Sequence, residues 1–239
     1  MSQVGTSRLI RDLMNAYFVE VYPCTIFSFL HRPTFTKAVE DESVSLCLLL
    51  AVCAISAKFV LPDSSPAQKW IAEAKRQAMM EIENGRMTSA TLGSLVICFH
   101  FDLYARDLVA AWMTSGSAIR LAFALRLNNF DANSQESKRT RLSWFEIESR
   151  RRLMWAVYMI DMYVSDGFSE YTNIPHSTMR IPLPCDEDAF SNGEEYDSGR
   201  LLLPDMGQDG VWSSPGVGPS KIRADEQSDK GTWHEVDSF

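Results

Sequence analysis

The chain has 239 residues, of which 46% are hydrophobic and 23% charged, the composition of a globular protein that can bury a sizeable core. Its net charge of −8 comes from the C-terminal end, because residues 186–239 hold 13 acidic and 4 basic residues while residues 1–185 hold 18 and 19. This distribution excludes a strongly basic chain that would bind nucleic acid through charge alone.

Cysteine usage and hydropathy exclude three further classes. The five cysteines are odd in number and widely spread, without the spacing of a zinc site or a disulfide framework. The N-terminus lacks the apolar segment of a signal peptide, and the longest uncharged apolar run, residues 43–57, is shorter than the roughly 20 residues of a membrane span. We therefore expect a soluble intracellular protein without a membrane partner.

Helical periodicity appears at the start of the chain. Apolar residues recur at helical spacing over residues 10–21, and a proline follows. Residues 26–35 form an apolar connector, in which Pro33 suits the first turn of a second helix. A largely buried helix should come next, capped by Asp41 or Ser43.

Three more helices are predicted before residue 128. One covers residues 67–83 and stops at Gly85, a second begins at Thr88 or Ser89, and Asp107 caps the third. Small residues in the middle of the third helix should let a neighbouring helix approach closely. Its inward residues are expected to be Leu108, Trp112, Ser115, Ile119 and Phe123.

A long helix over about residues 144–164 carries an arginine triplet. Glu146 precedes Arg150 by four residues, and Glu148 precedes Arg152 by four. This orientation is the favoured one for ion pairs on a helix surface. We therefore predict two surface pairs.

The remaining arginine of the triplet, Arg151, falls on the apolar face, with Asp161 near the same stripe. A buried charge needs a partner, which we expect on another helix. On this interpretation Arg151→Ala should destabilise more than Arg152→Ala, by about 3 kcal/mol against at most about 0.5 kcal/mol.

The fold class predicted from these patterns is all-α. No segment shows the alternation of a strand, so we expect a single irregular multi-helix bundle over residues 8–190. A Pro-rich extended segment should lie against the bundle, and the acidic tail over residues 191–239 should be poorly ordered. The acidic run 186–188 is interpreted as solvated.

The search for chemistry finds no catalytic, cofactor-binding or metal-binding residues, and we predict that the chain is not an enzyme. It lacks a Gly-rich phosphate loop, a nucleophile elbow and a His-Glu-x-x-His motif. The four histidines are expected to be structural or solvated: His31, His100, His176 and His234.

Four motifs in order, spanning roughly residues 8–190, resemble the regulatory domain of fungal transcription factors. This is the middle homology region of zinc-cluster activators, including the xylanolytic-activator type. The residues that carry the resemblance are His31, Arg32, Pro33 and Phe35; Gly116 and Arg120; Glu148, Arg150, Arg151, Arg152, Trp155 and Asp161; and Pro182 and Pro184.

The resemblance implies a nuclear protein that controls RNA polymerase II transcription through the transcription machinery or other transcription-factor subunits, with room for a small-molecule effector. It also implies DNA and zinc binding by a separate zinc cluster, whose cysteines this sequence lacks, so no cofactor is expected here. The family domain usually continues with more helices, so the chain is expected to be truncated at its C-terminal side. Two alternatives remain: a stand-alone partner or inhibitor of full-length factors, and a small all-α enzyme with a cryptic site.

Overall fold

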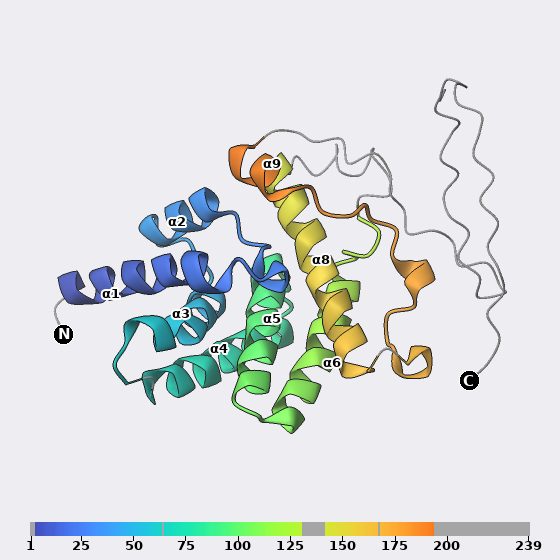
Figure 1. Ribbon diagram of the computed structural model, residues 1–239, viewed down its shortest axis with the longest axis horizontal. Helices are drawn as coiled ribbons and strands as arrows, with labels where there is room; N and C mark the ends of the chain where they lie inside the picture. Colours follow the sequence, from blue (N-terminus) through green and yellow to red (C-terminus); the bar gives the residue numbers. More distant parts are fainter. Residues whose placement is uncertain (1–2, 64, 131–141, 167, 194–239) are drawn as a thin grey trace, which may run out of the picture. The chain divides into compact units, whose positions relative to one another are not determined.

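The computed structural model describes residues 3–63, 65–130, 142–166 and 168–193 (Figure 1). Every regular element in these ranges is helical, which confirms the all-α prediction. None of the described helices is both long enough and apolar enough to cross a membrane. All but the first three residues of the predicted acidic tail lie outside the described residues.

The first helix, α1 (Gln3–Ala16), continues without a break into a π-helical turn over Tyr17–Val21, as the periodicity indicates. A short 3-10 turn, Thr25–Phe27, follows, and the Tyr17 hydroxyl donates a hydrogen bond to the Phe27 carbonyl at 2.9 Å. This bond fixes the connector against the end of the π turn.

Helix α2 (Arg32–Glu40) has a proline in its first turn, as predicted. The predicted cap of the next helix is wrong, because α3 (Leu46–Val60) is preceded by Ser45 rather than beginning near Asp41 or Ser43. The backbone N–H of Ser43 still donates to the Ala38 carbonyl and so belongs to the end of α2.

The centre of the fold is helix α5 (Ser89–Tyr104), which contacts α3, α4 (Ser65–Glu83), α6 (Leu108–Ala124) and α8 (Trp144–Val164) (Figure 1). The predicted caps Thr88 and Asp107 each accept a hydrogen bond from a backbone N–H three residues later. The stop at Gly85 is also confirmed, with φ +71°.

Helix α6 faces the core with its small side chains and not with its large ones. Ser115 and Ile119 are buried as predicted, but Leu108 and Trp112 are 68% and 59% exposed, so that part of the prediction is wrong. The stripe that packs inward is instead made of residues four or three positions apart with little volume: Ala111, Ser115, Ala118 and Ala122.

The closest helix approach is at Gly93 of α5, which the sequence analysis did not single out. A Cβ atom there would come within 2.8 Å of Phe29 Cε2 and 3.5 Å of a Leu48 methyl group. At Gly116 of α6 a Cβ would meet only the Arg120 guanidinium, at 3.0 Å. Gly116 therefore does not mediate close helix packing.

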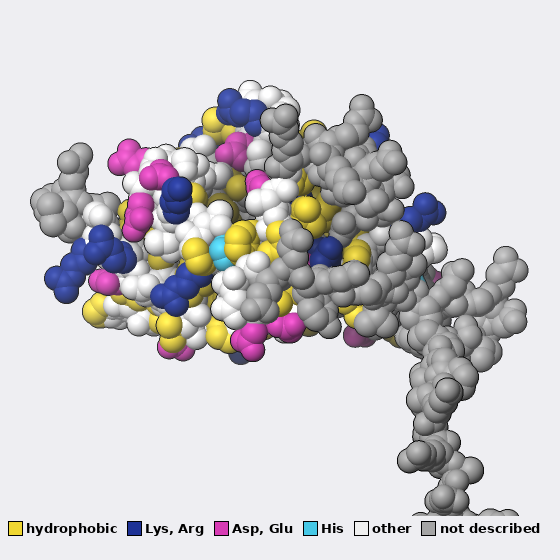
Figure 2. All heavy atoms as spheres, turned by 90° about the horizontal axis from the view of Figure 1, so that it is seen from above, with side chains coloured by type: hydrophobic (Ala, Val, Ile, Leu, Met, Phe, Trp, Pro, Cys, Tyr) yellow, Lys and Arg dark blue, Asp and Glu magenta, His cyan; other side chains and the backbone are white. Residues whose placement is uncertain are grey.

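Charges are mixed on the face of the molecule seen in Figure 2. Lys and Arg side chains there are separated by acidic and uncharged groups and form no continuous basic surface. This face therefore lacks the broad positive potential that non-specific nucleic-acid binding requires.

Candidate functional site

A row of polar and aromatic side chains on α8 organises the C-terminal half of the described chain. Its members are separated by four, three, three and three residues, so the row winds gradually around the helix. The segment after α8 runs back along this helix toward α9 (Glu187–Asn192), through 3-10 turns at Ser169–Tyr171 and His176–Thr178 (Figure 1). The row consists of Glu148, Arg152, Trp155, Tyr158 and Asp161; we call residues 172–186 the strap.

Asp161 holds the beginning of the strap. Its carboxylate is fully buried and accepts hydrogen bonds from the Asn173 backbone N–H at 2.8 Å, the Asn173 side-chain amide at 3.0 Å and the Ile174 backbone N–H at 2.7 Å. Three N–H donors therefore offset the cost of burying this charge.

Trp155 and Tyr158 hold the middle of the strap. The Trp155 indole N–H donates to the Pro182 carbonyl at 2.7 Å, and the Tyr158 hydroxyl lies 3.2 Å from His176 Nδ1. The Pro-rich segment therefore lies against the bundle as predicted.

Trp155→Phe should lower the free energy of unfolding by about 1 kcal/mol, because it removes this N–H donor and part of the ring while keeping an aromatic side chain. Urea denaturation followed by circular dichroism measures the change. A wild-type value for the variant would contradict a contribution from the Pro182 bond.

Arg152 and Glu148 hold the end of the strap. Arg152 Nε donates to Glu148 Oε1 at 3.1 Å, and its Nη1 contacts Glu187 Oε2 at 2.6 Å and the Ser28 carbonyl at 3.1 Å. Its Nη2 donates to the Cys185 carbonyl at 3.0 Å, while the Cys185 backbone N–H donates to Glu148 at 2.9 Å. One guanidinium thus joins α8, the N-terminal connector, the strap and α9.

The expected surface ion pair between Glu148 and Arg152 is wrong in its location, because Glu148 is fully buried and Arg152 is 6% exposed. Arg151 is buried as predicted, yet it donates to Glu148 Oε2 on its own helix rather than pairing only across to another one. Helical arithmetic placed Glu148 at the surface because it could not include the strap.

The other predicted surface pair is replaced by a capping box. Glu146 accepts from the Ser143 backbone N–H at 2.8 Å, while the Ser143 hydroxyl accepts from the Glu146 N–H at 3.3 Å. These bonds lower the pKa of Glu146, with a smaller contribution from the charge of Arg150.

The acidic run 186–188 is structured, and its interpretation as a solvated run is wrong. Asp186 caps α9 by accepting from the Ala189 N–H at 2.8 Å. Glu187 binds Arg152 and also accepts from the Tyr22 hydroxyl at 2.6 Å, which raises the pKa of Tyr22 further after the larger effect of burial.

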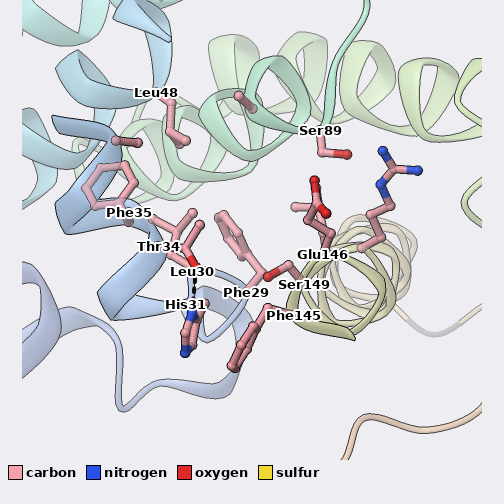
Figure 3. Close-up of a pocket in the computed structure, with 14 residues that line it drawn as sticks. Phe29, Leu30, His31, Thr34, Phe35, Leu48, Ser89, Phe145, Glu146 and Ser149 are labelled. Atoms are coloured by element: carbon pink, nitrogen blue, oxygen red, sulfur yellow. Dashed lines mark hydrogen bonds between the residues drawn. The ribbon is translucent and has the colours of Figure 1, made fainter. Parts of the chain in front are cut away.

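Two of the sequence motifs meet at a small cavity of about 290 Å³ between α2 and α8 (Figure 3). His31 accepts or donates a hydrogen bond with the Thr34 hydroxyl at 2.7 Å, and its ring stacks on Phe145 at 3.9 Å. Burial lowers the pKa of His31. Phe35 and Arg150 line the same cavity.

The remaining motif residues are distributed differently. Arg32 contacts α1, where its guanidinium donates to Asn15 at 3.2 Å and lies 5.4 Å from the centre of the Phe18 ring. Arg120 donates to the Gly116 carbonyl at 3.1 Å on an outer face of α6. The structure therefore does not bring Gly116 and Arg120 into the α8 site, whereas Pro182 and Pro184 belong to the strap.

A second cavity, of about 630 Å³, lies where the π turn meets α3, α4 and α5. Sequence reasoning missed it because its lining residues come from separate elements. Phe27 and Phe101 contribute to its mostly apolar wall, and Lys58 and His100 contribute nitrogen atoms. In the described part of the chain, no group of three or more His, Cys, Asp or Glu side chains could hold a metal ion.

His100 should make stability depend on pH, because burial lowers its pKa from 6.5 to about 4. As pH falls through this window the unfolded chain binds more protons than the folded one, so the free energy of unfolding decreases, by about 2 kcal/mol. Denaturation curves across the window should show a smaller decrease for His100→Phe than for the wild type. Equal decreases would contradict this assignment.

Comparison with known proteins gives the site its context. The family model described as "Fungal specific transcription factor domain" matches residues 14–221, which includes the whole of α8, the strap and α9. This family is a transcription-factor domain and not an enzyme family. No solved structure matches the chain.

Curated relatives agree with the family match. The chain is 29% identical over 231 residues to the Zn(2)-C6 fungal-type transcription factor FTF1c of Fusarium oxysporum f. sp. lycopersici, covering 89% of this chain and 24% of the relative. It is 29% identical over 183 residues to FTF1a of the same fungus, covering 72% and 17%. An uncharacterised transcriptional regulatory protein of Schizosaccharomyces pombe is 28% identical over 178 residues, covering 69% and 18%.

The chain thus spans about a quarter or less of the length of these relatives. The family match covers the four motifs in their order along the chain, and the structure shows that two of them, on α8 and the strap, form one buried polar network. The chain belongs to the fungal specific transcription factor domain family.

Proposed function

We propose that this chain is the regulatory and interaction domain of a nuclear transcription factor that controls RNA polymerase II transcription. The single observation that carries the proposal is the family match over residues 14–221, which includes every helix from α2 to α9. In this role the domain contacts the transcription machinery or other transcription-factor subunits, and DNA is bound by a module outside this chain.

The charge distribution supports this division of labour. Residues 1–185 carry 18 acidic and 19 basic residues, so the domain body has almost no net attraction for a polyanion. Contact with DNA through a separate module removes the need for a basic face on the helical domain, which is consistent with the mixed charges in Figure 2.

The role of the α8 network in this proposal is architectural. Arg152 and Asp161 attach the strap to the bundle at its two ends, so the surface that the strap and α9 form has a fixed shape. A partner that recognises this surface would therefore depend on buried residues that it does not touch.

A tethering experiment tests the proposal. The chain fused to a heterologous DNA-binding domain should change the output of an RNA polymerase II reporter, and Asp161→Ala should reduce this effect while the exposed-site control Lys69→Met retains it. The purified chain alone should not shift DNA in a gel. An inert fusion at normal protein level, or salt-sensitive nanomolar DNA binding, would overturn the proposal.

A further inference from the structure

The 630 Å³ cavity has the size and the lining of a small-molecule site. Ligand pockets are typically roughly 300–1,000 Å³, mostly apolar, with a few polar groups that orient the ligand. Here the apolar wall includes Phe27, Ile55, Phe101 and Tyr104, which come from the connector, α3 and α5. An apolar body of drug-like size would fit this volume.

One wall of the cavity has an irregular backbone. Glu20 and Val21, which line the cavity, belong to the π-helical turn over Tyr17–Val21 at the end of α1. Single π turns within helices are frequent at functional sites, because they displace side chains from regular helical positions. The connector that follows this turn supplies Phe27 to the cavity.

A positioned cation lies at the mouth of the cavity. Lys58 is exposed, and its ammonium group lies 4.7 Å from the centre of the Phe59 ring and 4.2 Å from that of Tyr104. Within the described ranges no carboxylate lies at ion-pairing distance from it. Two aromatic faces therefore orient a charge that remains available to an anion.

A second polar group lines the same cavity. His100 Nε2 is buried without a hydrogen-bond partner among the described residues, while the ring packs edge-on against Phe27 with centroids 4.8 Å apart. Burial lowers the pKa of His100 to about 4, so the imidazole is neutral near pH 7 and can donate one hydrogen bond. An unsatisfied buried nitrogen is costly unless a ligand supplies its partner.

The two nitrogen groups together favour a monoanion. Sites for phosphate generally collect several arginines or backbone N–H groups, and the cavity offers one ammonium and one neutral imidazole. Two carboxylates also line the cavity, but Glu20 is exposed, and Asp63 already accepts from the Ser65 N–H at 2.9 Å and its hydroxyl at 2.6 Å. These carboxylates therefore leave Lys58 as the charge that selects the ligand.

We propose that this cavity binds a monocarboxylic acid with an apolar body, whose carboxylate contacts Lys58 and His100. The inference rests on the proposed function in one respect: such a ligand would be an effector of the transcriptional domain. Binding itself requires only the cavity, and it can be measured on the purified chain without any transcriptional readout.

The test is isothermal titration of the purified chain with decanoate, decanol and decylammonium. Decanoate should bind with one site per chain and more tightly than either analogue. Lys58→Met keeps the apolar stem and removes the charge, and it should weaken decanoate binding roughly tenfold while leaving decanol binding unchanged. Lys69→Met, an exposed lysine of α4 outside the cavity, is the matched control and should bind like the wild type.

A second variant places the ligand within the cavity. Ile55→Trp fills space from a half-buried position and should abolish binding of both decanoate and decanol without a large change in melting temperature. Absence of decanoate binding, equal affinities for Lys58→Met and Lys69→Met, or tighter binding of decylammonium would each overturn the inference. An inert reporter fusion with normal decanoate binding would overturn only the proposed function.

Discussion

Arg152→Met is expected to lower the free energy of unfolding by about 4 kcal/mol, a large fraction of the stability of a domain of this size. The substitution leaves buried Glu148 with one cation instead of two and removes donors from the carbonyls of Ser28 and Cys185. It also removes the cation over the Phe190 ring, where the guanidinium carbon lies 4.0 Å from the ring centre. Urea denaturation of the purified chain measures the change.

The other two arginines of the triplet are the matched controls. Arg151→Met should cost about 2 kcal/mol, because Glu148 keeps its bond to Arg152. Arg150→Met should cost about 0.5 kcal/mol. The order Arg152, Arg151, Arg150 reverses what helical arithmetic predicts for the first two, and a larger effect of Arg151 would restore that interpretation. Arg152→Lys should fall between Arg152→Met and the wild type, because it keeps the charge without the planar fork.

The helices themselves were predictable because their signals are local. Thr88 and Asp107 cap the helices that they precede, and Gly85 ends α4, since each acts on backbone groups within four residues. The cap of α3 was not predictable in the same way. The chain stays bonded to Ala38 through Ser43, so an extra turn of backbone separates the two helices.

The α8 network was not predictable because its partners are distant in sequence. Arg152 reaches Ser28, which is 124 residues away, and Cys185, which is 33 residues away. Periodicity assigns the polar side of an amphipathic helix to water, and no property of α8 itself indicates that the strap covers that side. The large cavity escaped for a related reason, since Lys58 and His100 lie on different helices that only packing brings together.

The burial of α6 shows the limit of reading hydrophobicity as burial. Trp112 is large and apolar, yet it is exposed, while the small Ala118 on the same helix is fully buried. Close packing against α5 selects small volume over hydrophobicity, because helix axes can approach only where side chains are short. A sequence pattern that ranks residues by hydropathy alone therefore assigns this helix to the wrong face.

Asp161→Ala should detach the start of the strap and lower the free energy of unfolding by about 3 kcal/mol. The carboxylate is the acceptor for the backbone N–H groups of Asn173 and Ile174, and each buried donor left unsatisfied costs about 1–3 kcal/mol. Because the other end of the strap remains bound to Arg152, the loss should be local before it is global. Hydrogen exchange measures this directly, through the protection of the Ile174 amide.

The matched control for that substitution is Asp12→Ala, which removes an exposed carboxylate of α1 and should change stability by less than about 0.5 kcal/mol. In Asp161→Ala, the Ile174 amide should exchange much faster than in the wild type, while amides in the middle of α5 lose protection only as far as global stability falls. Unchanged protection at Ile174 would show that the strap is held elsewhere. Uniform loss across all helices would instead mean that the strap and the bundle unfold as one unit, so that the α8 network stabilises the whole domain and not only the surface that we propose partners recognise.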